Sequence, residues 1–128
     1  LAAGGGWVWY CVWVGCGWAK VRGLIEVGLG RVPGVDFIYY RSDLIGGGGL
    51  LYLLGKGIVV PGQVGLAGVN GFEVLQGLQR QLATMDACRR EIGTKAAEII
   101  AARVNDVEKE GQVTLAPTIS FGDTLRGV

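Results

Sequence analysis

VDFIYYRSDLIGGGGLLYLLGKGIVVPGQVGLAGV, residues 35–69, predicts a strand, a helix and a second strand in succession. The runs at 35–40 and 64–69 are short and apolar, as is typical of strands that are buried on both faces of a parallel sheet. Between them a helix is expected over about 44–55. Alternation of strand and helix indicates an α/β protein with a largely parallel sheet.

The four consecutive glycines Gly46–Gly49 raise the question of a phosphate-binding loop. A Walker loop needs G-x-x-x-x-G-K-[S/T], but the window at 50–57 has Leu50 at the first glycine and Gly57 at the hydroxyl position. A dinucleotide fingerprint needs G-x-G-x-x-G, and Leu51 stands where the last glycine belongs. Both phosphate motifs therefore fail on spacing.

Each of the same glycines destabilises a helix by up to about 1 kcal/mol relative to alanine. We therefore expect Gly46–Gly49 to lie at a helix start that is pressed closely against a neighbour. Ser42 or Asp43 is the expected N-cap of this helix, and Gly57 follows its end.

Further elements are expected along the rest of the chain: a strand at 7–14, a helix at 17–31, a short helix within 70–82, a helix at 88–106, and one or two strands within 112–121. The helix at 88–106 has the clearest pattern, because its apolar residues form one stripe: Ile92, Ala96, Ile99, Ile100 and Val104.

The N-terminal segment leaves two alternatives open. Residues 1–19 carry no charge, so a membrane span is one alternative, but five glycines interrupt the segment. The run at 7–14 is short, aromatic and β-branched, which favours a buried strand. The chain begins with Leu1, so we expect it to be cut from a longer protein.

The composition narrows the function. A net charge of +1 disfavours a basic nucleic-acid surface in these residues. The complete absence of histidine removes Ser-His-Asp and Cys-His catalysis. Three cysteines without close-spaced pairs favour buried free thiols over a disulfide framework or a zinc site. No metal or cofactor is expected.

The order of three motifs resembles the LacI family of sugar-responsive bacterial transcription regulators, and is most similar to its gluconate-repressor-like branch. The motifs are VDFIYYRSDLIGGGGLLYLLGKGIVVPGQVGLAGVNGFEV (35–74), LATMDACRREIGTKAAEIIAARV (82–104) and LAPTISFGDTL (115–125). The resemblance implies a periplasmic-binding-protein-like fold of two α/β subdomains with a small effector in the cleft between them. Residues 1–128 would form a single subdomain, the C-terminal half of that effector domain, without the DNA-binding head. It also implies a cytoplasmic protein that forms a homodimer.

Four residues are implied as ligand-binding by this resemblance, and each has a plainer interpretation. Asp43 matches a ligand-contacting aspartate, or is an N-cap, or both. Trp18 matches an aromatic that stacks on sugar rings, or lies in the core. Arg89 lies near a position that could pair with an acid group, or is a solvated first-turn arginine. Asn70 matches the polar residue of a Gly-Phe-Asn/Asp turn, where it stabilises the turn. Ser42 replaces the asparagine that is usual in the family.

Three functions remain. The first is the effector-binding portion of a repressor that responds to a sugar or sugar acid such as gluconate, reaching operator DNA only through a head outside this chain. The second is a periplasmic sugar-binding protein of a transport system. The third is a phosphate- or nucleotide-binding enzyme built around Gly46–Gly49, for which no catalytic constellation is present. The sequence therefore favours a protein that is not an enzyme.

Overall fold

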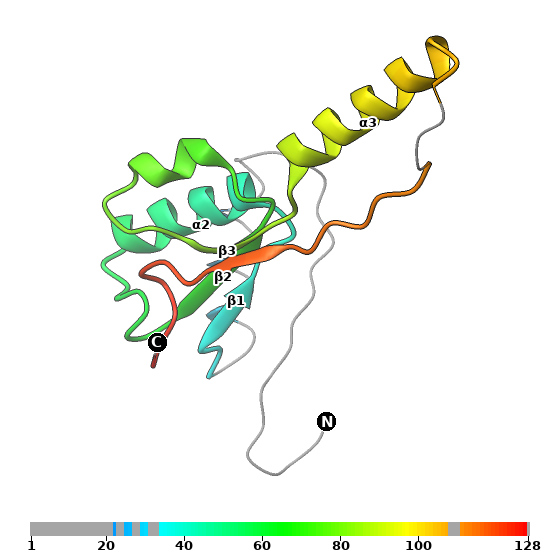
Figure 1. The fold of residues 1–128 in the computed structure, drawn as a ribbon. Coiled ribbons are helices and arrows are strands. Elements are labelled where there is room, and N and C mark those ends of the chain that lie inside the picture. The colour runs from blue at the N-terminus through cyan, green and yellow to red at the C-terminus, as the bar shows by residue number, and fades with distance from the viewer. Residues whose placement is uncertain (1–21, 23–24, 27–28, 31–33, 108–110, 128) are drawn as a thin grey trace.

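The structure of the protein, a computed structural model, describes residues 22, 25, 26, 29, 30, 34–107 and 111–127. Its body is a four-stranded sheet in the order β1-β2-β3-β4 (Figure 1). The first three strands are parallel, and β4 runs antiparallel to β3. The strands are β1 (Phe37–Tyr39), β2 (Gly65–Val69), β3 (Ala83–Asp86) and β4 (Thr118–Ser120); the helices are α2 (Asp43–Gly55), the 3-10 helix η1 (Glu73–Gly77) and α3 (Arg89–Val104).

The α/β class and the parallel sheet expected from the sequence are confirmed. The predicted strands at 35–40 and 64–69 correspond to β1 and β2, and the short helix within 70–82 is η1. Strand β3 was not predicted, and of the region 112–121 only the part after Pro117 is a strand. The predicted strand at 7–14 lies outside the described residues.

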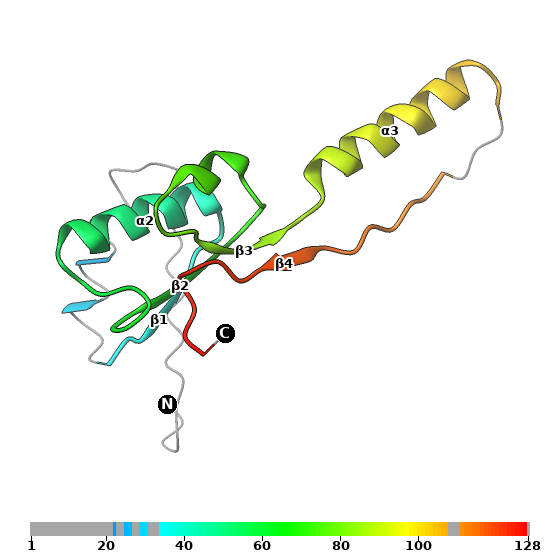
Figure 2. The ribbon, with the colours of Figure 1, turned by 60° about the vertical axis from the view of Figure 1, so that its left-hand side comes forward.

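The core lies between the sheet and α2, which packs against β2 (Figure 2). Leu50 and Leu53 of α2 and Leu66 of β2 are almost completely buried. Burying such a side chain contributes about 1.5–3 kcal/mol relative to leaving it exposed. Ile25, from the helix expected at 17–31, belongs to the same cluster.

The glycine run lies inside α2 and packs closely, as expected. A Cβ atom at Gly46 would lie 2.7 Å from Leu82 Cδ2 and 3.3 Å from Tyr40 Cδ2. One at Gly47 would lie 2.8 Å from Leu75 Cδ2 of η1, and one at Gly49 would overlap the Tyr40 hydroxyl. These glycines therefore let α2 approach the sheet and η1 more closely than side chains would permit.

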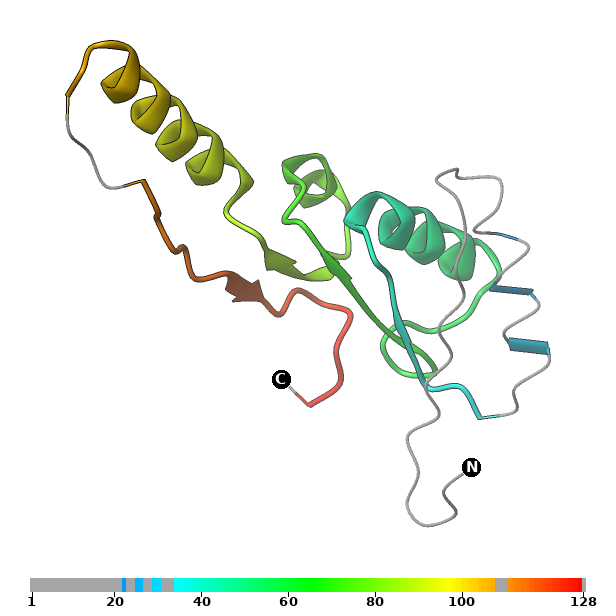
Figure 3. The same ribbon diagram turned by 90° about the vertical axis from the view of Figure 1, so that its right-hand side faces the viewer.

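Helix α3 forms as predicted, and its apolar stripe is exposed in the described part of the chain. Ile92, Ile100 and Val104 are each more than half exposed, and α3 contains no buried residue. The helix projects away from the sheet in all three views, so no described element covers the stripe (Figure 3). Periodicity predicts a helix, but it does not supply the surface that the helix would cover.

The C-terminal segment is fastened to the sheet by Thr124, which is fully buried. Its hydroxyl donates to the carbonyl of Leu66 at 2.7 Å and accepts the N–H of Ala83 at 2.8 Å. Among the described helices, none is long and apolar enough to cross a membrane.

Candidate functional site

Three of the four predicted site residues come together at one edge of the sheet. The carboxyl ends of parallel strands lie at the same edge, where open α/β sheets bind ligands. Asn70 directly follows β2, Arg89 is the first residue of α3 after β3, and Asp43 is the first residue of α2 after β1. Trp18 lies outside the described residues.

Asn70 is held in an unusual backbone conformation. Its φ angle is 114°, in a region that costs a residue other than glycine about 1–3 kcal/mol and persists only where the surroundings enforce it. Its N–H donates to the carbonyl of Met85 on β3 at 2.9 Å. Within the described part of the chain, its side-chain amide makes no hydrogen bond. The strained residue therefore presents an amide that is free to bind a ligand.

Asp43 supports the turn formed by Asn70, Gly71 and Phe72. Its side chain is 1% exposed, and the carboxylate accepts the N–H of Phe72 at 3.0 Å. Ser42 occupies the N-cap position of α2, and neither it nor any other side chain caps the helix. The interpretation of Asp43 as an N-cap is therefore wrong, because its carboxylate bonds across to another turn.

Thr84, in the middle of β3, is a site residue that the sequence analysis missed. Its hydroxyl lies 2.7 Å and 2.8 Å from the two carboxylate oxygens of Asp43, and it accepts the N–H of Gly71 at 3.3 Å. Opposite Thr84 in the sheet is Gly68, where a Cβ atom would overlap the Asp43 carboxylate. Glycine inside a strand often marks such a close approach, and Gly68 is the sequence signal that points to this cluster.

Arg89 bonds the backbone carbonyl groups of the same turn. Its Nε donates to the carbonyl of Asn70 at 2.8 Å, and its Nη2 donates to the carbonyl of Gly71 at 3.4 Å. The guanidinium also lies 4.0 Å from the centre of the Phe72 ring, a cation–π contact worth about 0.5–1 kcal/mol at an exposed site. Arg89 makes no ion pair with any described carboxylate, so its charge is available to an anion.

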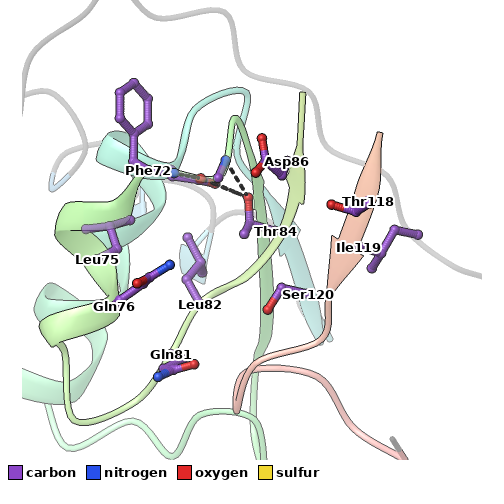
Figure 4. A pocket seen from close by; sticks show the side chains of 12 residues that line it. Phe72, Leu75, Gln76, Gln81, Leu82, Thr84, Asp86, Thr118, Ile119 and Ser120 are labelled. Carbon is purple, nitrogen blue, oxygen red and sulfur yellow. Dashed lines mark hydrogen bonds between the residues drawn. The ribbon is translucent and has the colours of Figure 1, made fainter. Parts of the chain in front are cut away.

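A cavity of about 400 Å³ lies beside the turn, between η1, β3 and β4 (Figure 4). This volume is within the range of small-molecule sites. Asp43, Thr84 and Phe72 line it, and the remainder of the lining is mixed: polar side chains such as Gln76, Gln81 and Asp86 alternate with aliphatic ones. Asn70 and Arg89 are not among its lining residues.

The sequence model of the periplasmic binding protein-like domain matches residues 33–125, well over half of the chain. The chain belongs to this family. The periplasmic-binding-protein-like fold expected from the sequence is thus confirmed.

Several relatives of this periplasmic-binding-protein-like chain are transcription regulators. It is 29% identical over 103 residues to the HTH-type transcriptional regulator IdnR of Escherichia coli, covering 80% of this chain and 31% of that protein. The crystal structure of a LacI family regulator from Silicibacter pomeroyi is 58% identical, with a TM-score of 0.80, over 87% of this chain and 34% of the other. A LacI family regulator from Arthrobacter sp. FB24, solved in complex with lactose, is 27% identical, with a TM-score of 0.71. The match covers 81% of this chain and 40% of that one.

The resemblance to LacI-type regulators is confirmed by these relatives. The chain spans about a third of the lengths of IdnR and of the Silicibacter regulator.

Proposed function

We propose that this chain forms part of the effector-binding site of a LacI-type regulator, and that the effector is a sugar or sugar acid such as gluconate. The observation that carries the proposal is Asn70, whose strained backbone and unpaired amide lie at the carboxyl edge of the parallel strands. Strained backbone conformations of this kind are concentrated at functional sites. They persist only where the surrounding structure maintains them.

The chemistry of this edge suits a polyol. The Asn70 amide offers both donors and an acceptor, so it can bind a hydroxyl group in either role. Arg89 carries a guanidinium that bonds two backbone carbonyls but no described carboxylate, which suits the acid group of a sugar acid. We assign Asp43 to the wall of the site and Trp18 to stacking on the sugar ring.

A regulator is favoured over a transport protein by the 58% identity to the Silicibacter regulator. The lactose complex of the Arthrobacter regulator supports a sugar as the ligand class. A phosphate site at the glycine run is disfavoured by packing, because Gly46, Gly47 and Gly49 are buried against neighbouring side chains.

We also propose that the chain is one subdomain of a longer effector domain. The whole protein would act in the cytoplasm as a homodimer, and it would bind operator DNA through a separate DNA-binding head. The exposed apolar stripe of α3 supports a further surface that covers it, since Ile92, Ile100 and Val104 are costly to leave in water.

The proposal is tested with the protein translated from the complete reading frame that contains these residues. Gluconate, glucose, lactose and ATP are each titrated by calorimetry, and operator release is then followed by fluorescence anisotropy. We expect saturable binding of at least one sugar or sugar acid, and a change in operator affinity when it binds. Saturable binding of ATP, with none of the three sugars or sugar acids bound, would overturn the proposal.

A further inference from the structure

We propose that Thr84 is a positioning residue, which fixes the turn Asn70–Phe72 and thereby the orientation of the Asn70 amide toward the effector. This inference rests on the proposed function for the identity of the ligand, but the positioning itself can be measured without one.

Neighbouring elements hold the backbone of the turn Asn70–Phe72 by hydrogen bonds. All three of its backbone N–H groups are bonded to neighbouring elements: Asn70 to Met85, Gly71 to Thr84, and Phe72 to Asp43. The carbonyls of Asn70 and Gly71 are bonded to Arg89. The turn is therefore held by hydrogen bonds to β3, α2 and α3.

Thr84 contributes two of these restraints at once. One hydroxyl supplies one hydrogen and two lone pairs. Here the hydrogen goes to the Asp43 carboxylate, and a lone pair accepts the N–H of Gly71. Asp43 in turn holds Phe72, so a single hydroxyl restrains Gly71 directly and Phe72 through the carboxylate.

The strain at Asn70 makes this restraint consequential. A residue at a φ of 114° relaxes when its neighbours no longer enforce that conformation. If Gly71 loses its partner, we expect the turn to sample other conformations, and the Asn70 amide to spend less time in the orientation that binds a ligand. Affinity then falls by the fraction of time that is lost.

The experiment compares three variants. Thr84→Val removes the hydroxyl while keeping the side-chain shape, and Thr84→Ser retains the hydroxyl. Thr124→Val is the matched control, because the Thr124 hydroxyl also makes two hydrogen bonds in this sheet, but with Ala83 and Leu66 and not with the turn. Amide hydrogen exchange by NMR is measured in the absence of ligand, and gluconate and lactose are titrated by calorimetry.

In Thr84→Val we expect the exchange rates of the Gly71 and Phe72 amides to rise about tenfold more than those of other amides, relative to the unaltered protein. We expect the affinity for the bound sugar or sugar acid to fall about tenfold. Thr84→Ser restores both. With Thr124→Val, exchange at the turn rises no more than elsewhere in the protein, even though the protein is less stable.

Two results would overturn the positioning role. One is unchanged exchange at Gly71 and Phe72 in Thr84→Val. The other is an equal effect of Thr84→Ser and Thr84→Val, which would assign the effect to packing. If Thr84→Val loosens the turn but the unaltered protein binds neither ligand, the positioning is supported, and the proposed function fails for these ligands.

Discussion

The Oγ1 atom of Thr84 lies 2.7 Å and 2.8 Å from the two carboxylate oxygens of Asp43, 41 residues away in the sequence. This contact joins the middle of β3 to the first turn of α2. Because the carboxylate also accepts the N–H of Phe72, it joins α2, β3 and the turn that follows β2 through one buried group. The fold itself therefore organises this edge of the sheet.

Asp43→Ala is expected to destabilise the protein by at least about 2 kcal/mol, since hydrogen bonds to a charged group are worth about 1.5–3 kcal/mol and Phe72 and Thr84 lose their acceptor. The free energy of unfolding is measured with urea. Asp36→Ala is the control, because Asp36 is half exposed and its ion pair with Arg126 is long, at 3.8 Å. We expect that variant to lose no more than about 1 kcal/mol. Equal losses in the two variants would contradict the buried role of Asp43.

Much of the fold could be predicted from the sequence, because β1, α2 and β2 follow from apolar runs that are separated by clear turns. Strand β3 could not, since Ala83–Asp86 is short and only its first residue is buried. The prediction of helix α3 was correct, but the sequence did not show what would lie against its exposed apolar stripe. Periodicity encodes the conformation of a segment, but not which surface lies against it.

The candidate site was only partly predictable. The family resemblance pointed to Asn70 and Arg89, and the structure places both at the same turn. Thr84 carries no local signal of its own, because its importance arises from a contact with a residue far away in the sequence. Gly68 was the indirect clue: it leaves the space that the Asp43 carboxylate occupies.

Gly49→Ala is expected to cost about 1–3 kcal/mol, the usual penalty for overpacking a core. The added methyl group would meet the Tyr40 ring, whose Cζ atom would lie 2.5 Å away. Gly55→Ala is the control at the end of the same helix, where nothing lies within 4 Å of the added atom. There we expect a gain of up to about 1 kcal/mol from helix propensity. Thermal or urea unfolding checks both variants, and a stabilised Gly49→Ala would refute the packing explanation of the glycine run.

Tyr40→Phe is expected to leave the stability unchanged or to raise it by up to about 1 kcal/mol. The Tyr40 hydroxyl is buried and has no hydrogen-bond partner among the described protein groups. Its removal therefore relieves a desolvation cost without breaking a bond. Urea unfolding at neutral pH provides the measurement, and a loss of more than about 1 kcal/mol would mean that the hydroxyl does have a partner.

The Tyr40 phenol should also make the stability of the protein depend on pH in the alkaline range. Burial raises the pKa of the Tyr40 phenol above its ordinary value of 10.0. Above about pH 10 the unfolded chain releases this proton while the folded protein retains it, so stability falls with pH, by at most about 1.4 kcal/mol per pH unit from this group. In Tyr40→Phe this part of the fall disappears. The comparison is made by urea unfolding between pH 8 and 11, and identical pH profiles for the two proteins would contradict it.

The central claim is that the strained Asn70 presents its amide to a sugar or sugar acid. Isothermal titration of gluconate and lactose into the protein and its Asn70→Ala and Asn70→Asp variants tests this most directly. We expect the unaltered protein to bind one of the two, Asn70→Ala to bind it at least about tenfold more weakly, and Asn70→Asp to retain part of the affinity for a hydroxyl-bearing ligand through its remaining acceptor oxygens. Undiminished binding by Asn70→Ala would contradict the account.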